Sequence, residues 1–376
     1  MSTPAGKSSW LRPSLNWLVA ALPVAFALRY VPAWHNETAL FIFSALAIIP
    51  IAGWMGHATE QLAHRLGEGI GGLLNASFGN AAELIIALMA LRAGHIEVVK
   101  ASITGSIIGN LLLVLGVSVF AGGLRFRAQR FNKTAARSSC TALILAAAAL
   151  VIPTVFHQAA EQRPGGWTPA AEQNLSLAIA VILLATYGAM LVFSLVTHKQ
   201  LFVGEETAGG KDGADSHAEK PWPVGQAVGV LLGATALVAW VSEFLVGAVE
   251  AAQHSLGVTE TFVGVIIVAI VGNAAEHSTA VTMALKNKMD LALGIAVGSS
   301  LQIALFVAPV LVFSSYLFPH QLSLEFTVPE VVAVVIAAFV TDQIAGDGES
   351  NWLEGVQLLA LYAILAVLFY FLPAIH

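Results

Sequence analysis

The stretch VIIVAIVGNAAEHSTAVTMAL, residues 265–285, is mostly apolar and carries one acidic residue, Glu276, near its middle. A segment of about 20 mostly apolar residues is long enough to cross the ~30 Å hydrocarbon core of a bilayer as a helix. Reading outward between charged or Pro/Gly-rich breaks gives eleven such spans. They lie at 14–31, 38–63, 70–92, 96–123, 137–157, 172–197, 223–256, 260–285, 289–318, 327–345 and 353–373. Because a bilayer core offers no water to backbone amides, an all-α membrane protein without a sheet is predicted.

The composition indicates that lipid is the main solvent of this chain. Of its 376 residues, 57% are hydrophobic and 11% are charged, whereas soluble domains carry about a quarter charged residues. The net charge of −6 excludes a basic nucleic-acid-binding surface. We therefore expect an integral, multi-pass membrane protein whose surroundings are the lipid bilayer. A prokaryotic plasma membrane is the first expectation for this compact chain, and an organelle (vacuolar) membrane is the second.

The distribution of basic residues predicts the orientation. With the N-terminus placed inside, 13 of the 17 Lys and Arg residues fall in cytoplasmic loops. Cytoplasmic loops of membrane proteins are enriched in Lys and Arg. The sequence therefore predicts an N-inside, C-outside protein with an odd number of spans.

Two identical pentapeptides, called the repeated words below, occur 193 positions apart. Residues 79–83 and residues 272–276 both read GNAAE, and each word is followed at the same distance by a Gly-Ser pair, at 105–106 and at 298–299. Their glutamates, Glu83 and Glu276, are the two of 23 acidic residues that fall near the middle of a span. A charge at that depth costs ~2.5–3.5 kcal/mol on insertion scales, so both residues are functional candidates.

The repeated words predict the domain organisation. The eighth helix follows the third by five spans, which is an odd step. The two helices therefore run in opposite directions and the repeats are inverted. Inverted repeats with Gly-interrupted helices are typical of transporters whose site lies at the bilayer midplane. The expected division is an N-terminal helix at 1–35, a first five-helix repeat at 36–202, a cytoplasmic linker at 203–222 and a second five-helix repeat at 223–376.

The residues of the two words suit a calcium site. Ca²⁺ takes six to eight oxygen ligands in a pliable geometry. Gly79 and Gly272 favour local unwinding, which would turn a backbone carbonyl toward each glutamate. Asn80 and Asn273 offer amide oxygens. The partner helices add side chains that could complete the site through water: Ser106, Ser299 and Gln302.

His277 adjoins Glu276, but consecutive helical residues point about 100° apart. Direct ligation, proton transfer and ordinary helix packing all stay open for it. Two ionised glutamates in a low dielectric would repel each other, whereas one Ca²⁺ or two protons would neutralise them. Proton coupling is therefore expected to involve Glu83 and Glu276, with His277 as a further candidate.

The words, the Gly-Ser helices and the phrases VIIVAIVGNAAEH (265–277) and GSSLQIALFVAP (298–309) resemble the Ca²⁺/cation antiporter family, in particular its calcium/proton exchanger (CAX) branch. The resemblance implies a ten-helix core of two inverted repeats preceded by an extra N-terminal helix. It also implies Ca²⁺ binding at Glu83 and Glu276, aided by the Gly carbonyls, Asn amides, serines and Gln302 named above. Ca²⁺ would then be the transported substrate, with no fixed cofactor.

The expected function is a secondary active transporter that exchanges Ca²⁺ for protons by alternating access at a midplane site with two glutamates. Other divalent cations are further candidate substrates. A Na⁺/Ca²⁺ exchanger is the first alternative, although neither word contains the Pro or hydroxyl residues found beside the acid in sodium-coupled relatives. A passive cation channel is a weaker one. An enzyme is not expected, because H-E-x-x-H, G-x-S-x-G and G-x-x-x-x-G-K-[S/T] motifs are missing from the sequence. The sequence leaves the oligomeric state open, with a homo-oligomer as one option.

Overall fold

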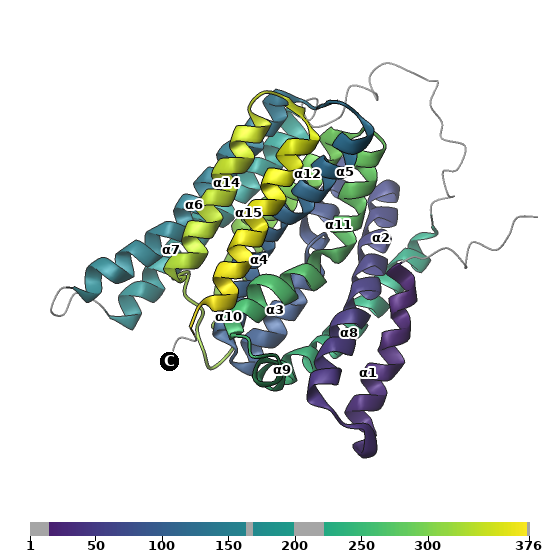
Figure 1. The fold of residues 1–376 in the computed structure, drawn as a ribbon, viewed down its shortest axis with the longest axis vertical. Coiled ribbons are helices and arrows are strands. Elements are labelled where there is room, and N and C mark those ends of the chain that lie inside the picture. The colour runs from purple at the N-terminus through teal and green to yellow at the C-terminus, as the bar shows by residue number, and fades with distance from the viewer. Residues whose placement is uncertain (1–14, 163–167, 199–221, 374–376) are drawn as a thin grey trace, which may run out of the picture.

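The computed structural model describes residues 15–162, 168–198 and 222–373, and this part of the chain is almost entirely helical (Figure 1). Nine of its helical segments are long and apolar enough to cross a membrane, and a shorter apolar helix, Leu15–Tyr30, precedes them. These ten match ten of the predicted spans. The eleventh, at 70–92, corresponds to the end of one helix and to the next. The predicted all-α membrane fold is confirmed, while the expected linker at 203–222 lies outside the described residues except for Trp222.

The first half of the chain contains η2 (Leu15–Ala20), α1 (Ala21–Tyr30), η3 (Pro32–Trp34), α2 (Glu37–Phe78), α3 (Ala81–Ala93), α4 (Ile96–Ile108), η4 (Gly109–Val114), α5 (Leu115–Arg125), α6 (Lys133–Glu161), α7 (Pro169–Val192) and η5 (Phe193–Thr197). The second half contains α8 (Val224–Gly247), α9 (Val249–Leu256), α10 (Glu260–Phe262), η8 (Val263–Val268), α11 (Ala269–Leu285), α12 (Met289–Gln302), η9 (Ile303–Val307), α13 (Ala308–Ser315), α14 (Val328–Ala345) and α15 (Trp352–Phe371).

Helix α2 joins two predicted spans without a loop between them. The helix bends back sharply. This is seen from the close approach of Gly71 to Ala63, since a Cβ placed on Gly71 would lie only 2.5 Å from the carbonyl oxygen of Ala63. Residues eight apart on a straight helix are separated by ~12 Å along its axis. The predicted break near 64–69 is thus a bend within helical backbone, and it returns the chain toward the membrane centre.

Two details of the predicted layout are wrong. The span expected at 223–256 is divided at Ala248 into α8 and the short α9. The expectation of no sheet also fails at one place, since β1 (Gln129–Arg130) pairs antiparallel with β2 (Glu349–Ser350). Both strands lie in loops between spans. Outside the lipid, backbone groups of one segment are free to form hydrogen bonds with another segment. An ion pair of 2.9 Å between Arg130 and Glu349 accompanies the pairing.

The helices form two packed groups that meet at the repeated words. One buried apolar cluster gathers α1, α2 and α8, which lie together on one side of the molecule in Figure 1, and the other gathers α4 to α7 with α11 to α15. Helix α3 contributes to both. Close crossing of the repeats depends on Gly105, because a Cβ there would lie 2.3 Å from the carbonyl oxygen of Val265. Small residues at helix contacts allow such approach within membranes.

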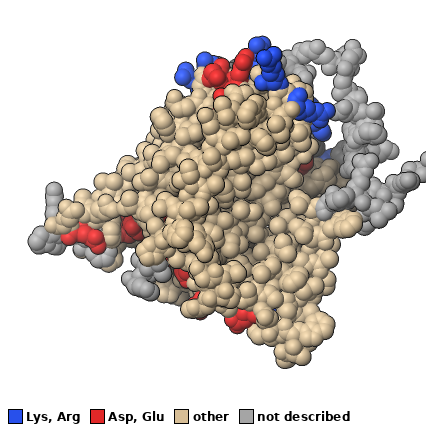
Figure 2. Space-filling model, viewed as in Figure 1, with Lys and Arg blue, Asp and Glu red and all other residues tan. Residues whose placement is uncertain are grey.

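The charges visible on the surface fit the predicted orientation. On the face shown in Figure 2, Lys and Arg gather at the upper end, where α5 and α11 end, while acidic residues also mark the lower end. The upper end is the one predicted to face the cytoplasm. Lys286, after α11, belongs to it, and Leu317, after α13, belongs to the opposite end.

Cysteine labelling tests this orientation. Cys140 is buried and is replaced by Ala, after which one Cys is introduced at Lys286 or at Leu317, whose side chain is 83% exposed. In intact cells a membrane-impermeant maleimide should label Leu317→Cys at once and Lys286→Cys only after permeabilisation. The reverse pattern would invert the orientation, and labelling of both from one side would contradict the membrane span Met289–Ser315 between the two positions.

Candidate functional site

Each repeated word packs against the glutamate of the other. A Cβ placed on Gly272 would lie 2.9 Å from Cγ and 3.5 Å from Oε1 of Glu83. A Cβ placed on Gly79 would lie 3.8 Å from Oε1 of Glu276. The missing side chain of each glycine therefore makes room for the carboxylate of the opposite repeat, and the two glutamates are brought into one region.

The backbone of the two words differs. Gly79 and Asn80 form a turn between α2 and α3, whereas Gly272 and Asn273 lie inside the continuous helix α11. The helix is therefore interrupted in the first word, although the departure from helical angles lies at Asn80 and Gly79 keeps helical angles. The expected unwinding is wrong at Gly272. In α11 the Asn273 side chain donates to the carbonyl of Ala269 one turn back, at 2.9 Å, and the irregular backbone lies upstream in the π-helical turn η8.

Ser299 connects Glu276 to the first word. Its hydroxyl donates to Asn80 Oδ1 at 2.7 Å and is also in hydrogen-bond contact with Glu276 Oε2. Asn80 Nδ2 in turn donates to Gln302 Oε1. A serine hydroxyl has one proton, so Ser299 can donate to only one of these two oxygens at a time. Asn80 and Glu276 therefore share the same donor.

A related cluster surrounds the second word. Asn273 Nδ2 donates to Ser106 Oγ at 3.0 Å, and Asn110 Nδ2 donates to Asn273 Oδ1 at 3.0 Å. The sequence reasoning missed Asn110. By the offset of 193, Gln302 corresponds to Gly109, which has no side chain, and the neighbouring Asn110 supplies the amide instead. Its signal was an uncharged polar residue in mid-span, four positions after Ser106.

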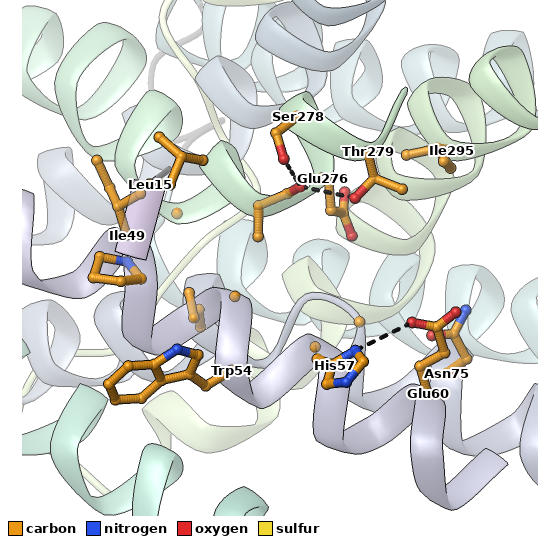
Figure 3. Close-up of a pocket in the computed structure, with 18 of the residues that line it drawn as sticks. Leu15, Ile49, Trp54, His57, Glu60, Asn75, Glu276, Ser278, Thr279 and Ile295 are labelled. Carbon is orange, nitrogen blue, oxygen red and sulfur yellow. Dashed lines mark hydrogen bonds and ion pairs between the residues drawn. The ribbon is translucent and has the colours of Figure 1, made fainter. Parts of the chain in front are cut away.

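A cavity of about 1220 Å³ reaches Glu276 from one side of the membrane. Figure 3 shows Trp54, His57 and Glu60 of α2 across this cavity from Glu276. Trp222, next to the expected linker, also lines it. Since the predicted orientation places the linker and the end of the second span inside, we call this cavity the cytoplasmic vestibule. Gly79, Gly272, Ala275 and Glu276 are among the residues that line it.

Glu83 lies on the other side of the site. Within the described residues it borders a separate space of about 10 Å³ together with Ser102 and Ser106, which is about the size that one water requires. All other residues that line this space are apolar. Oε2 of Glu83 is buried and has no hydrogen-bond partner in the described part of the chain. The two carboxylates are therefore unequally accessible, with Glu276 facing the vestibule and Glu83 closed away from it.

No described Lys, Arg or His forms an ion pair with either glutamate, while the glycine contacts above bring the two carboxylates into one region. Like charges in a low dielectric repel strongly. Neutralisation of the pair thus calls for bound cations or protons.

All nine predicted metal-site residues take part in these contacts. They are Glu83, Glu276, Gly79, Gly272, Asn80, Asn273, Ser106, Ser299 and Gln302. His277 is not part of them. Its Nε2 is buried and has no partner among the described residues, so its role in proton transfer stays a prediction.

Comparison with known proteins assigns the chain. The family model described as sodium/calcium exchanger protein matches residues 36–196 and 226–371. The chain belongs to this family. A Ca²⁺/H⁺ antiporter of Synechocystis is 47% identical over 372 residues, covering 95% of this chain and 97% of that protein. The Ca²⁺/H⁺ antiporter ChaA of Bacillus subtilis is 48% identical over 334 residues, covering 89% and 92%.

A solved structure gives the same result. The structure of native YfkE is 44% identical, has a TM-score of 0.80, and is matched over 96% of this chain and 100% of that one. The resemblance to the calcium/proton exchanger branch is thereby confirmed. This family member is a multi-pass membrane protein.

Substitution of Gly272 tests the packing of the words. In Gly272→Ala the new methyl group would meet Glu83 Cγ at 2.9 Å, so the carboxylate must move. We expect Ca²⁺ affinity to fall by at least about tenfold, equivalent to ~1.4 kcal/mol, because ligand position is disturbed. Calcium binding to the purified protein measures this.

Gly294→Ala is the matched control, since a Cβ there meets nothing within 4 Å. Both changes replace a helical glycine and should stabilise the helix by up to ~1 kcal/mol. Unchanged calcium affinity in a folded Gly272→Ala protein would show that Glu83 does not depend on this glycine.

Proposed function

We propose that this chain is a secondary active transporter that exchanges Ca²⁺ for protons at the site between the two repeated words. The observation that carries the proposal is the reciprocal contact of Gly272 with Glu83 and of Gly79 with Glu276. It places two carboxylates together without a compensating basic residue in the described chain. The names of the relatives, Ca²⁺/H⁺ antiporters at 47% and 48% identity, support the pair of ions.

The ligand set of the proposal is the one expected from sequence. Glu83 and Glu276 provide the charges, and the oxygens of Asn80, Asn273 and Ser299 provide neutral donors. Gly79, Gly272, Ser106 and Gln302 complete the set directly or through water. Hard cations such as Ca²⁺ prefer this all-oxygen environment. To bind Ca²⁺, Asn80 Oδ1 would exchange its hydrogen bond from Ser299 for the cation.

Alternating access accounts for the unequal exposure of the two carboxylates. The vestibule of about 1220 Å³ leads to Glu276, whereas Glu83 borders a space of about 10 Å³. This arrangement corresponds to a state that is open to the cytoplasm and closed to the outside. The group of α1, α2 and α8 is the natural moving part, because the vestibule lies between α2 and α11.

Charge neutralisation couples the two ions. One Ca²⁺ cancels two carboxylate charges, and two protons do the same. The empty dianion is poorly solvated in the closed site and resists the passage between open states. Loaded forms therefore cross readily and the empty form does not, which makes the exchange obligatory. The two glutamates titrate as a coupled pair.

The bacterial relatives support a location in a prokaryotic plasma membrane. There the vestibule would take Ca²⁺ from the cytoplasm and the external side would supply protons. No enzymatic step is part of the proposal.

Neutral substitutions test the role of the glutamates. Glu83→Gln and Glu276→Gln each keep the side-chain shape and remove one charge, so we expect ⁴⁵Ca²⁺ uptake into proteoliposomes to fall by at least about a hundredfold, or ~2.7 kcal/mol. Glu243→Gln is the control, because this glutamate is exposed on α8 away from the site. Normal uptake by Glu83→Gln in a protein of native melting temperature would make that residue structural.

The pH dependence of binding tests the coupling. Metal ligands bind in their deprotonated form, so acid competes with the cation. We expect calcium affinity to fall as the medium is acidified, with protons released to the solution on binding. Uptake should follow an imposed pH gradient and ignore a sodium gradient. A response to sodium alone would indicate a Na⁺/Ca²⁺ exchanger, and affinity independent of pH with uptake that needs neither gradient would indicate a channel.

A further inference from the structure

A histidine–glutamate pair joins the two repeats on the side opposite the vestibule. His95 Nδ1 lies 3.7 Å from Oε1 of Glu260, with 15% of the histidine side chain and 35% of the glutamate side chain exposed. His95 follows the left-handed Gly94 at the end of α3, and Glu260 is the first residue of α10. Both backbones are fixed locally, since Thr259 caps α10 by accepting from the amide of Phe262.

The paired residues lie at the ends of the two helices that carry the glutamates: His95 follows the last turn of one, and Glu260 is the first residue of the other. Helix α3 starts two residues before Glu83 and runs to the His95 turn. The segment α10–η8–α11 begins at Glu260 and runs without interruption to Glu276. The pair thus connects the external ends of both carboxylate-bearing helices, a place where a small shift changes the separation of the carboxylates.

Several charged or titratable groups face His95. Glu260 contributes from α10, and Glu250 contributes its charge from α9. His320, from the loop after α13, is 3.5 Å from a Cβ placed on Gly94. On the neighbouring turns of its own helices are Arg92 and Glu97. The acidic groups closest to the ring therefore favour its charged form.

The Glu260 carboxylate, followed by the more distant Glu250, raises the pKa of His95 above its usual value, against the opposing effect of burial. The folded state thus binds the proton more tightly than the unfolded state does. Stabilisation by the pair is fully present below the ordinary histidine pKa of about 6.5 and is lost as pH rises through the raised value.

The inverted repeat makes His95 unusual. The residue 193 positions later is Lys288, which likewise stands directly before the next helix, α12. Lysine keeps its charge throughout the physiological pH range, whereas histidine titrates within it. The external turn therefore carries a histidine where its cytoplasmic equivalent carries a lysine.

We propose that His95 is a positioning residue of the exchange reaction: when protonated, it holds the external end of α3 to the start of the helix that carries Glu276, and so sets the spacing of the two carboxylates. The proposal rests on the proposed function. External acid then acts in two ways, because it competes with Ca²⁺ at the glutamates and also tightens the frame that holds them.

Two substitutions at His95 separate these effects. His95→Gln removes the charge and His95→Lys makes it permanent, and calcium affinity of the full chain is measured from about pH 5.5 to about pH 8.5. Loss of a partly buried pair changes an equilibrium by about fivefold. His95→Gln should therefore bind about fivefold more weakly than wild type at the acid end and equally at the alkaline end. His95→Lys should match wild type in acid and bind about fivefold more tightly in alkali.

The matched control is the pair His35–Glu37, at 3.8 Å in the turn before α2, which does not join the carboxylate helices. His35→Gln and His35→Lys should follow wild type at every pH. Glu260→Gln removes the partner of His95 and should reproduce the acid-side loss, so the test does not depend on the folding of one variant.

Each outcome decides the proposal. Curves of His95→Gln and His95→Lys that both coincide with wild type would overturn it, and so would a loss in His95→Gln that is the same at every pH. If wild-type calcium binding is itself insensitive to protons, the proposed function fails. The role of the His95–Glu260 pair is then judged by melting temperature. Wild type and His95→Gln must differ in melting temperature in acid and agree in alkali.

Discussion

Two carboxylates buried in a lipid-embedded protein dictate the arrangement around them. Neither Glu83 nor Glu276 has a basic partner in the described chain, so each needs space for a neutralising ion and a wall that keeps out lipid. The glycine of the opposite repeat provides the space, at 2.9 Å from a glutamate Cγ in one case and 3.8 Å from an Oε1 in the other. The crossing of α3 with α11, the nearby amides and the closely packed Gly105 all serve that contact.

Much of this could be predicted from sequence because lipid imposes strong rules. Apolar length marks the spans, and an acidic residue in mid-span is rare enough to mark Glu83 and Glu276. Identical words at a fixed offset showed that the same chemistry occurs twice. The eighth span follows the third by five, an odd step that required opposite directions, which is consistent with α3 and α11 meeting at the words.

Other features do not follow from hydropathy, because it reports composition and not backbone direction. The bend between Ala63 and Gly71 lies in helical backbone, and the π-helical turns η4, η8 and η9 contain ordinary apolar residues. Gly272 lies inside a continuous helix whereas its twin Gly79 stands at the end of one, since neighbouring contacts outweigh the propensity of one residue. Asn110 was overlooked because it breaks the symmetry on which the reasoning relied.

That broken symmetry has a consequence for direction. In two perfect inverted copies, a two-fold rotation about an axis in the membrane plane would relate the state open to one side to the state open to the other, and the two would have equal energy. Here Gln302 bonds Asn80 in one half, while Asn110 replaces it from the adjacent position in the other. The two end states are therefore chemically distinct and differ in energy. Under the alternating access proposed above, an unloaded molecule in a membrane without gradients would rest preferentially on one side, and its half-saturating calcium concentration would differ between the two faces.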